Sequence, residues 1–307
     1  PGFVFRTKQL GVPLFLINAR LSGRSFKRVQ LFGSAGRSLF QSFVGILAQS
    51  EPDAKRYQAL GVNDVIVTGN MKFDVPEKAA NQSLGKQWKR ALREQERLVV
   101  CAASTRAGED LIMIDAWKKL LSEFSSEIKP LLIVVPRHPE RFTEVANLLY
   151  QSTLSFERRS NLSDPRSSAE FASVPHWTNV DVLLGDSMGE MGAYYNATDL
   201  VVMGGSLLPT GGQNLIEACA NGCPVILGEH TYNFQQASED AIACGAAERI
   251  PATLPHELAQ SLSETIKNLL TNTTQREIMS AKALEYASVH QGATQRILDR
   301  LRPVLQS

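Results

Sequence analysis

Residues 203–217 combine four glycines with a carboxylate in a pattern that suits the binding of a nucleotide. The glycines at 204, 205, 211 and 212 follow an apolar strand candidate, and they allow the backbone to pass close to a ligand. A helix is predicted over 214–221, and its free N–H groups and positive dipole end favour a phosphate. Glu217 lies one turn inside that helix, where its carboxylate can accept hydrogen bonds from a ribose diol. The segment therefore predicts a nucleotide-sugar site.

The last part of this segment also fits a purely structural role. Asn214 and Glu217 have the spacing of a capping box, in which the glutamate only reaches back to the start of its own helix. A cap of this kind requires no paired glycines upstream, so it leaves the glycines at 204–205 and 211–212 unexplained. Both interpretations of Glu217 stay open at this point.

The sequence around the glycine loop alternates between short apolar runs and helix-like segments. The runs at 98–102, 130–135, 181–184, 200–203 and 224–227 are too short for helices and suit buried parallel strands. Helices are predicted between them at 108–123, 139–151, 188–196 and 214–221. This alternation builds a doubly wound parallel sheet, whose ligands bind beyond the carboxyl ends of the strands.

Polar or glycine-rich loops follow all five of these predicted strands. They cover residues 104–109, 136–141, 185–190, 203–217 and 228–234. Because the carboxyl ends of parallel strands meet at one edge of a sheet, we expect the loops to form one composite nucleotide site.

The first 75 residues show a shorter series of the same kind. Strands are predicted at 12–17, 45–48 and 65–67, and a helix at 52–60 is opened by Pro52 and stopped by Gly61. We expect part of a second Rossmann-like domain here, joined by a polar, strand-poor linker at 76–96. The chain has no initiator methionine and no strand–helix unit before this series. We therefore expect that it begins inside a larger protein.

Composition and charge exclude several classes of protein. The chain is 43% hydrophobic and contains no run of 18 apolar residues, so we expect no membrane span. Its four cysteines and five histidines show no metal-ligand spacing, and we expect buried reduced thiols, no metal and no cofactor.

The first 50 residues contain basic side chains and no acid, which favours an anionic membrane surface as partner, although a solvated basic face is the alternative. No aromatic residues alternate with these charges, so nucleic acid is not an expected partner. The basic residues are Arg6, Lys8, Arg20, Arg24, Lys27, Arg28 and Arg37.

Taken in order, the loops resemble those of the 3-deoxy-manno-octulosonic acid (Kdo) transferases of lipopolysaccharide biosynthesis. The matching segments are 18–22, 48–51, 68–74, 103–105 with 108–109, 136–141, 185–190, 204–207 with 211–212, and 230–234. The resemblance implies the α/β GT-B architecture, with two Rossmann-like doubly wound domains, of which the N-terminal one is incomplete. Residues 1–75 would be the rear of the acceptor domain and 97–285 the CMP-Kdo donor domain. A C-terminal helix at 286–307 would pack back on the N-terminal domain.

The resemblance also implies an activity, which is inverting transfer of Kdo from CMP-Kdo to a lipid A precursor (lipid IVA). The family acts at the cytoplasmic face of the bacterial inner membrane. Its general-base glutamate and its membrane anchor lie upstream of Pro1, so we expect no catalytic residue in this chain and no activity of the chain alone. The alternatives are a catalytically silent CMP-sugar-binding fragment and, less favoured, a GT-B sugar-nucleotide epimerase.

The resemblance assigns donor contacts to three loops. Arg137 would meet the phosphate or base side of CMP, unless it pairs with Glu140. Met188 would pack on the nucleotide, unless it belongs to the core. Gln213 stands where the family usually has histidine. The expected donor-binding residues are Pro136, Arg137, Met188, Gly189, Glu190, Gly211, Gly212, Gln213, Asn214, Leu215, Ile216 and Glu217; Arg20, Arg24 and Lys27 are the expected contacts to acceptor phosphates.

Overall fold

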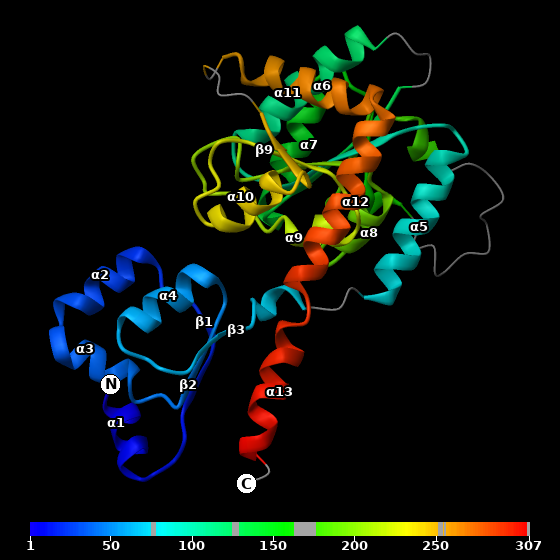
Figure 1. The fold of residues 1–307 in the computed structure, drawn as a ribbon. Helices are drawn as coiled ribbons and strands as arrows, with labels where there is room; N and C mark the ends of the chain where they lie inside the picture. The colour runs from blue at the N-terminus through cyan, green and yellow to red at the C-terminus, as the bar shows by residue number, and fades with distance from the viewer. Residues whose placement is uncertain (75–77, 125–128, 163–175, 251–253, 255, 306–307) are drawn as a thin grey trace. The chain divides into compact units, whose positions relative to one another are not determined.

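A computed structural model describes residues 1–74, 78–124, 129–162, 176–250, 254 and 256–305 (Figure 1). The chain divides into two compact units, Pro1–Pro76 with Val289–Ser307, and Glu77–Ser288. Among the described residues, none of the helices combines the length and the apolar content that crossing a bilayer demands.

The first unit is built on a three-stranded parallel sheet in the order β1-β2-β3. Strand β2 is central and fully buried, as its continuous apolar run predicts. The elements of this unit are α1 (Gly2–Gln9), β1 (Phe15–Ala19), α2 (Gly23–Leu31), α3 (Gly33–Phe40), β2 (Gly45–Ala48), α4 (Glu51–Ala59), β3 (Val65–Val67), the 3₁₀ turn η1 (Met71–Phe73) and α13 (Ala293–Leu305).

The second unit contains a seven-stranded parallel sheet in the order β10-β9-β8-β4-β5-β7-β6. Its strands are β4 (Val99–Thr105), β5 (Leu131–Pro136), β6 (Phe156–Arg158), β7 (Val182–Leu184), β8 (Leu200–Met203), β9 (Val225–Leu227) and β10 (Ala247–Arg249). Its helices are α5 (Ala79–Arg93), α6 (Glu109–Glu123), α7 (Phe142–Gln151), α8 (Met191–Ala197), α9 (Ile216–Ala220), α10 (Gln235–Ala243), α11 (Leu258–Thr271) and α12 (Thr273–His290), with 3₁₀ turns η2 (Pro139–Arg141), η3 (Arg159–Asn161) and η4 (His176–Asn179). Parallel pairing throughout brings all the carboxyl strand ends to one edge.

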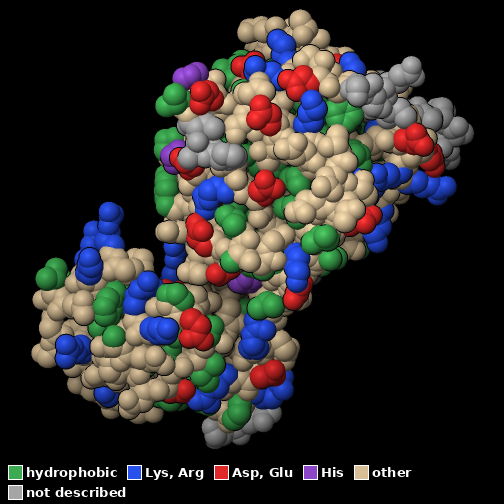
Figure 2. Space-filling model, turned by 45° about the horizontal axis from the view of Figure 1, so that its top comes forward, with side chains coloured by type: hydrophobic (Ala, Val, Ile, Leu, Met, Phe, Trp, Pro, Cys, Tyr) green, Lys and Arg blue, Asp and Glu red, His purple; other side chains and the backbone are tan. Residues whose placement is uncertain are grey.

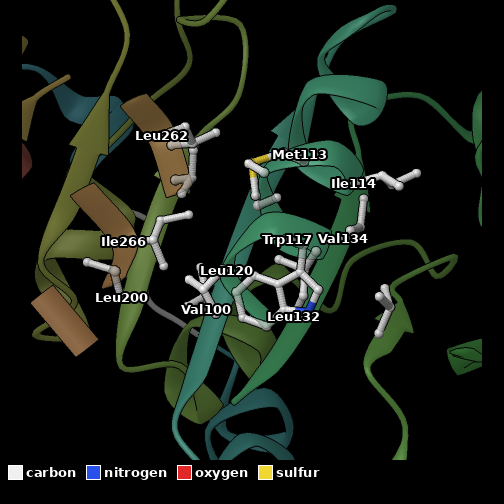
Figure 3. Close-up of a cluster of buried hydrophobic side chains, with 14 of the residues drawn as sticks. Val100, Met113, Ile114, Trp117, Leu120, Leu132, Val134, Leu200, Leu262 and Ile266 are labelled. Carbon is white, nitrogen blue, oxygen red and sulfur yellow. The ribbon is translucent and has the colours of Figure 1, made fainter. Parts of the chain in front are cut away.

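The core of this unit follows from the two-residue period of its strands. Val100, Leu132 and Leu200 face one side of the sheet, where they meet Trp117 of α6 and Ile266 of α11 (Figure 3). The intervening strand residues face the other side, where α8 packs against β4. Both faces are covered, which explains why the central strands read as unbroken apolar runs.

Several expected boundaries differ from the structure. The first strand is 15–19 rather than 12–17, and the helix expected over 188–196 is α8, which begins at Met191. Residues 79–93 of the expected linker form α5, whose Trp88 and Leu92 are buried. Gly85 of α5 lies against the carbonyl of Ala193, so α5 and α8 approach closely. Apolar residues four apart signal this helix, although the segment is polar on average.

The C-terminal helix α13 is fastened to the first unit at its amino end. Asp74 accepts hydrogen bonds from the N–H groups of Gly292 (2.7 Å), Ala293 (3.2 Å) and Thr294. Arg296 donates to the carbonyl of Thr68 at 2.9 Å. Burial raises the pKa of the Asp74 carboxyl, but the N–H donors lower it by more, so the net pKa lies below its usual value.

We therefore expect Asp74→Asn to loosen α13 in a pH-dependent way. Because the folded-state pKa is depressed, the stabilisation is fully present above about pH 5 and is lost as pH falls through the folded-state pKa. At pH 7 the variant should exchange the amide hydrogens of 293–305 about fivefold faster, since a lost helix cap costs about 1 kcal/mol. Hydrogen-exchange mass spectrometry measures this, and the difference from wild type should shrink toward pH 3.

Asp299→Asn is the matched control, because it makes the same change on the exposed side of the same helix. Equal exchange rates in Asp74→Asn and wild type at pH 7 would contradict the role of this carboxylate.

Candidate functional site

The five loops expected to converge do lie at one edge of the larger sheet. They follow β4, β5, β7, β8 and β9, and these strands are neighbours in the observed order. Strand β4 occupies the centre, between β5 and β8. The loops after these three strands are therefore adjacent, as the rule for doubly wound sheets requires.

The glycine loop after β8 is held by the buried side chain of Glu109, the first residue of α6. One oxygen of Glu109 accepts from the N–H groups of Leu207 (2.9 Å) and Leu208 (3.3 Å). The other accepts from Gly205 (2.6 Å) and Arg106 (2.9 Å). The side chain is fully buried, so these four N–H groups replace the water that a carboxylate would otherwise bind.

The glycines in this loop are required by neighbouring protein segments. A Cβ atom on Gly204 would lie under 3.0 Å from the carbonyl group of Ser104, and one on Gly211 would collide with Asn233. Gly205, Gly211 and Gly212 also have positive φ angles. The sequence alone predicted that these glycines admit a ligand, which stays a prediction; the structure shows that neighbouring strand-end loops pack against Gly204 and Gly211.

Strand β4 ends in a strained turn next to Gly204. Ser104 has a φ of +58°, and the pairing of β4 with β5 shifts register between Ala103 and Thr105. A left-handed serine in a bulge costs on the order of 1 kcal/mol, and such strain is concentrated at functional sites. The bulge directs the chain after Thr105 toward α6 and Glu109.

The second half of the glycine loop differs from the predicted helix start. Helix α9 begins at Ile216 and has five residues rather than spanning 214–221, so its dipole is short. The Asn214 side chain accepts from the N–H of Ile216 at 3.1 Å and donates to the Glu217 carboxylate at 3.2 Å. A capping box would instead join Glu217 to the backbone N–H of Asn214. Glu217 is exposed, with its carboxylate oriented by Asn214.

The loop after β5 contains an exposed arginine, Arg137, and a buried one, Arg141. Pro136 is the last residue of β5, and the N–H of Arg137 donates to the carbonyl of Thr105 at 3.0 Å. The Arg137 side chain is exposed and, within the described residues, forms no ion pair with Glu140. His138 lies 2.6 Å from Arg106, measured from Nε2 to Nη1, so the imidazole accepts and the guanidinium donates.

Arg141 ties the ends of β4 and β5 together. It forms a buried ion pair with Asp110 and donates to the carbonyl of Thr105 at 3.1 Å. Thr105 in turn donates to Asp110 at 2.6 Å. Burial lowers the pKa of Arg141, but hydrogen bonding to Asp110 and the charge of that carboxylate raise it by more.

The loop at 185–190 is exposed at its tip and anchored at its base. Met188 is 67% exposed, which excludes the core role that sequence left open. The carbonyl of Gly189 accepts from Asn81 at 2.9 Å. Glu190, expected to contact the nucleotide, forms an ion pair with the buried Arg159 at 2.8 Å. Its second carboxylate oxygen is buried and has no hydrogen-bond partner among the residues that the structure describes.

Residues 158–160 hold this loop through hydrogen bonds and ion pairs to Asp186 and Glu190. Asp186 pairs with Arg158 at 2.7 Å and accepts from Ser160. Burial raises the pKa of Asp186, but these partners lower it by more, to a net value below the usual one. Arg159 lies over the ring of Trp88, 5.4 Å from its centroid, a cation–π contact.

The smaller unit has its own ordered strand-end loops. Asn18, at φ +49°, accepts from the N–H of Met71 at 3.2 Å and, through its carbonyl, from Gln49 at 2.9 Å. Asp53 accepts from the N–H of Leu21 at 2.9 Å. These bonds connect the loops after all three strands. Arg20 is exposed in the first of these loops, and Arg24 and Lys27 are exposed one turn apart on α2.

Sequence reasoning assigned no role to Glu109, Asp110 or Arg141. The local signal of Glu109 and Asp110 is an acidic pair in the first turn of a helix after a strand, which by itself indicates stabilisation of the helix dipole. Within the part of the chain that the structure describes, no cluster of three or more His, Cys, Asp or Glu is arranged to hold a metal ion.

Comparison with known proteins gives consistent matches. The family described as 3-Deoxy-D-manno-octulosonic-acid transferase (kdotransferase) matches residues 1–75. A 3-deoxy-D-manno-octulosonic acid transferase of Bordetella pertussis is 40% identical over 301 residues, which are 98% of this chain and 66% of that protein. One of Haemophilus influenzae is 33% identical over 310 residues, 100% of this chain and 67% of that protein. The chain therefore spans about two thirds of the length of these relatives.

Solved structures agree with the observed architecture. The C-terminal CMP-Kdo binding domain of WaaA from Acinetobacter baumannii matches with a TM-score of 0.57 and 28% identity, over 68% of this chain and 98% of that one. The UDP-GlcNAc 2-epimerase of Neisseria meningitidis matches with a TM-score of 0.56 at 16% identity, over 98% of this chain and 72% of that one. The second likeness is one of fold, and both fit the expected GT-B architecture.

The close approach of the Ser104 backbone to Gly204 predicts that a methyl group at position 204 destabilises the fold. We expect Gly204→Ala to lower the melting temperature by roughly 5–10 °C, because overpacking against the backbone of Ser104 costs about 1–3 kcal/mol. Gly189→Ala is the matched control in a neighbouring loop, where a Cβ would find 3.9 Å of space and only the positive φ is strained. It should cost roughly 2–4 °C. Equal losses in differential scanning calorimetry would contradict the packing described for Gly204.

Proposed function

The chain belongs to the 3-deoxy-D-manno-octulosonic acid transferase family, and from this we propose that its larger unit binds CMP-Kdo as a glycosyl donor. The observation that carries the proposal is the polar carboxyl edge of the seven-stranded sheet. There Arg137 and Glu217 are exposed and, within the described residues, free of ion pairs. We propose transfer of Kdo to a lipid A precursor (lipid IVA), with inversion at the anomeric carbon, in lipopolysaccharide biosynthesis.

Two side chains would divide the recognition of the CMP moiety. The planar guanidinium of Arg137 suits a phosphate oxygen pair, and its exposed position leaves all its donors available. Glu217, held by the Asn214 amide at 3.2 Å, would accept hydrogen bonds from the ribose hydroxyls. Met188 and Gly189, at the exposed tip of their loop, would cover the nucleotide.

The reaction needs charge stabilisation on the leaving group. As the acceptor hydroxyl attacks the anomeric carbon, the bond from that carbon to the phosphate oxygen breaks and the electron pair leaves with CMP. Arg137 and backbone N–H groups near Gln213 would stabilise this developing charge, a contribution of about 3–4 kcal/mol per donor in comparable sites. The acceptor proton requires a base, and we assign that role to none of the described residues.

The smaller unit would receive the acceptor at an anionic membrane surface. Its basic residues on α1 and α2 lie among exposed apolar ones, with Phe3 75%, Leu31 87% and Phe32 73% exposed. Figure 2 shows blue Lys and Arg side chains and green hydrophobic ones together on the surface of this unit. Basic and apolar groups together suit lipid headgroups. We propose that Arg20, Arg24 and Lys27 bind the acceptor phosphates, at the cytoplasmic face of the inner membrane.

The same experiments distinguish a Kdo transferase from two other functions, a protein that only binds the donor and a sugar-nucleotide epimerase. A protein that only binds the donor would bind CMP and release no free CMP from CMP-Kdo when the acceptor is added. A sugar-nucleotide epimerase of GT-B fold would prefer uridine nucleotides. Titration with CMP, UMP and UDP separates the second from the Kdo transferase assignment, because tighter binding of UDP would contradict a CMP-Kdo site.

We expect Arg137→Ala and Glu217→Ala each to weaken CMP binding at least tenfold, about 1.4 kcal/mol, in isothermal titration calorimetry. The reason is that each variant removes one polar contact proposed for CMP. The melting temperature should stay within about 2 °C of wild type, because both side chains are exposed.

Arg90→Ala is the matched control, because Arg90 is an exposed arginine on α5 that forms an ion pair with its helix neighbour Glu94. It should leave CMP affinity unchanged. A lowered melting temperature with unchanged CMP affinity in Glu217→Ala would instead support a structural role for that residue.

The membrane proposal predicts a loss of vesicle binding in the double variant Arg24→Glu/Lys27→Glu. Each basic side chain near an anionic bilayer contributes about 1 kcal/mol, so removing two should reduce binding to phosphatidylglycerol vesicles about thirtyfold. Co-sedimentation at 0.1 M salt measures this, and high salt should weaken wild-type binding too. Lys118→Glu/Lys119→Glu, with the same change in net charge on exposed positions of α6, should bind like wild type. Equal loss in both variants would contradict a localised surface.

A further inference from the structure

The Glu109 carboxylate occupies a position that is built like an anion-binding site. Its two oxygens accept four backbone N–H groups, two on each oxygen. These contacts use the full accepting capacity of a carboxylate group. The side chain is fully buried and, within the described residues, has no ion-pair partner.

Three of these donors belong to consecutive turns of the glycine loop, at Gly205, Leu207 and Leu208. Convergent N–H groups in such loops form nests that bind phosphate in many nucleotide sites. In this protein the nest is filled from inside by a carboxylate 96 positions earlier in the chain than Gly205. A donor phosphate therefore cannot use these N–H groups, and the negative charge of Glu109 disfavours it there.

The contacts of Glu109 also fix the position of the two segments proposed to bind the donor, which contain Gln213 and Arg137. The carbonyl of Gly205 accepts from the N–H of Gly212 at 2.5 Å and from Thr210 at 3.0 Å. The bond between Gly205 and Gly212 fixes the position of the backbone at Gln213, the next residue. On the other side, the N–H of Arg106 is fixed by Glu109, and the Arg106 side chain reaches His138 in the loop that contains Arg137.

We propose that Glu109 is the positioning residue of the donor site, acting as a built-in anion. By filling the nest it fixes the glycine loop and confines the donor phosphate to the side of Arg137 and Gln213. The proposal rests on the CMP-Kdo site proposed above. Glu109 touches no substrate, and it acts through Gly205, Gly212 and Arg106.

Replacing Glu109 tests this with a readout that simple destabilisation would not reproduce. Glu109→Ala removes the anion and leaves the nest empty; Glu109→Gln keeps the shape but turns an amide toward N–H donors. We expect both to bind CMP at least tenfold more weakly at a temperature where circular dichroism shows them folded. Glu109→Asp, which keeps the charge one methylene shorter, should retain more CMP affinity than either. If the other two variants fail to fold, the CMP affinity of Glu109→Asp alone tests the proposal, and it should lie below that of wild type.

Acetate should rescue Glu109→Ala, because it has the size of the missing part of the side chain. With 50 mM sodium acetate, compared with the same concentration of sodium chloride, we expect a higher melting temperature and a partial return of CMP affinity. Met113→Ala is the control, since Met113 is fully buried one turn later on the same helix. It should melt lower than wild type, bind CMP normally and not respond to acetate.

Two results would overturn the proposal. One is CMP affinity within twofold of wild type in folded Glu109→Ala or Glu109→Gln. The other is a melting temperature of Glu109→Ala that acetate raises no more than chloride does. The acetate measurement contains no nucleotide, so it tests the built-in anion separately. Wild-type protein that binds no CMP would instead overturn the proposed donor site.

Discussion

A carboxylate that is fully removed from water has to find all its hydrogen-bond donors inside the protein. Glu109 finds them in four backbone N–H groups at the carboxyl edge of the larger sheet. The amino edge shows the opposite arrangement around the buried guanidinium of Arg97, which donates to the carbonyls of Lys129, Pro130, Thr178 and Val180. Burial lowers the pKa of Arg97. Glu109 therefore binds backbone N–H groups at the carboxyl edge of the sheet, and Arg97 binds backbone carbonyls at the amino edge.

The edge organised by Glu109 determines which groups are left for a ligand. Gly204 and Gly211 permit contacts between loops, and the N–H groups of Gly205, Leu207 and Leu208 are used internally. Among the exposed residues described at this edge are Arg137 from the loop after β5, Met188 after β7 and Glu217 after β8. A donor bound there would meet a preorganised surface, because hydrogen bonds hold in place the segments that carry Arg137 and Glu217. In the smaller unit a buried carboxylate also holds a strand-end loop, because Asp53 accepts from the N–H of Leu21 next to Arg20.

Sequence predicted the central strands within a few residues, because strands covered on both faces are unbroken apolar runs. The edge strands β6 and β10 were missed, since Phe-Glu-Arg and Ala-Glu-Arg carry no such signal. The short α9 was overestimated, because the Asn214 side chain takes the N–H of Ile216 and the helix starts later. The family resemblance is confirmed by relatives along the whole chain. The role of Glu109 was out of reach, because three of its four hydrogen-bond partners lie 96–99 positions away and their approach depends on the sheet order.

We propose that the donor nucleotide lies on the carboxyl edge of the seven-stranded sheet, beside the N–H groups that Glu109 already occupies. Hydrogen exchange with and without CMP tests this placement. Saturating CMP should slow exchange in 137–138, 188–190 and 212–217, while the amides of Gly205, Leu207 and Leu208 should be protected equally in both states. Protection confined to the amino edge around Arg97, or protection of Gly205–Leu208 that appears only when CMP is bound, would contradict the account.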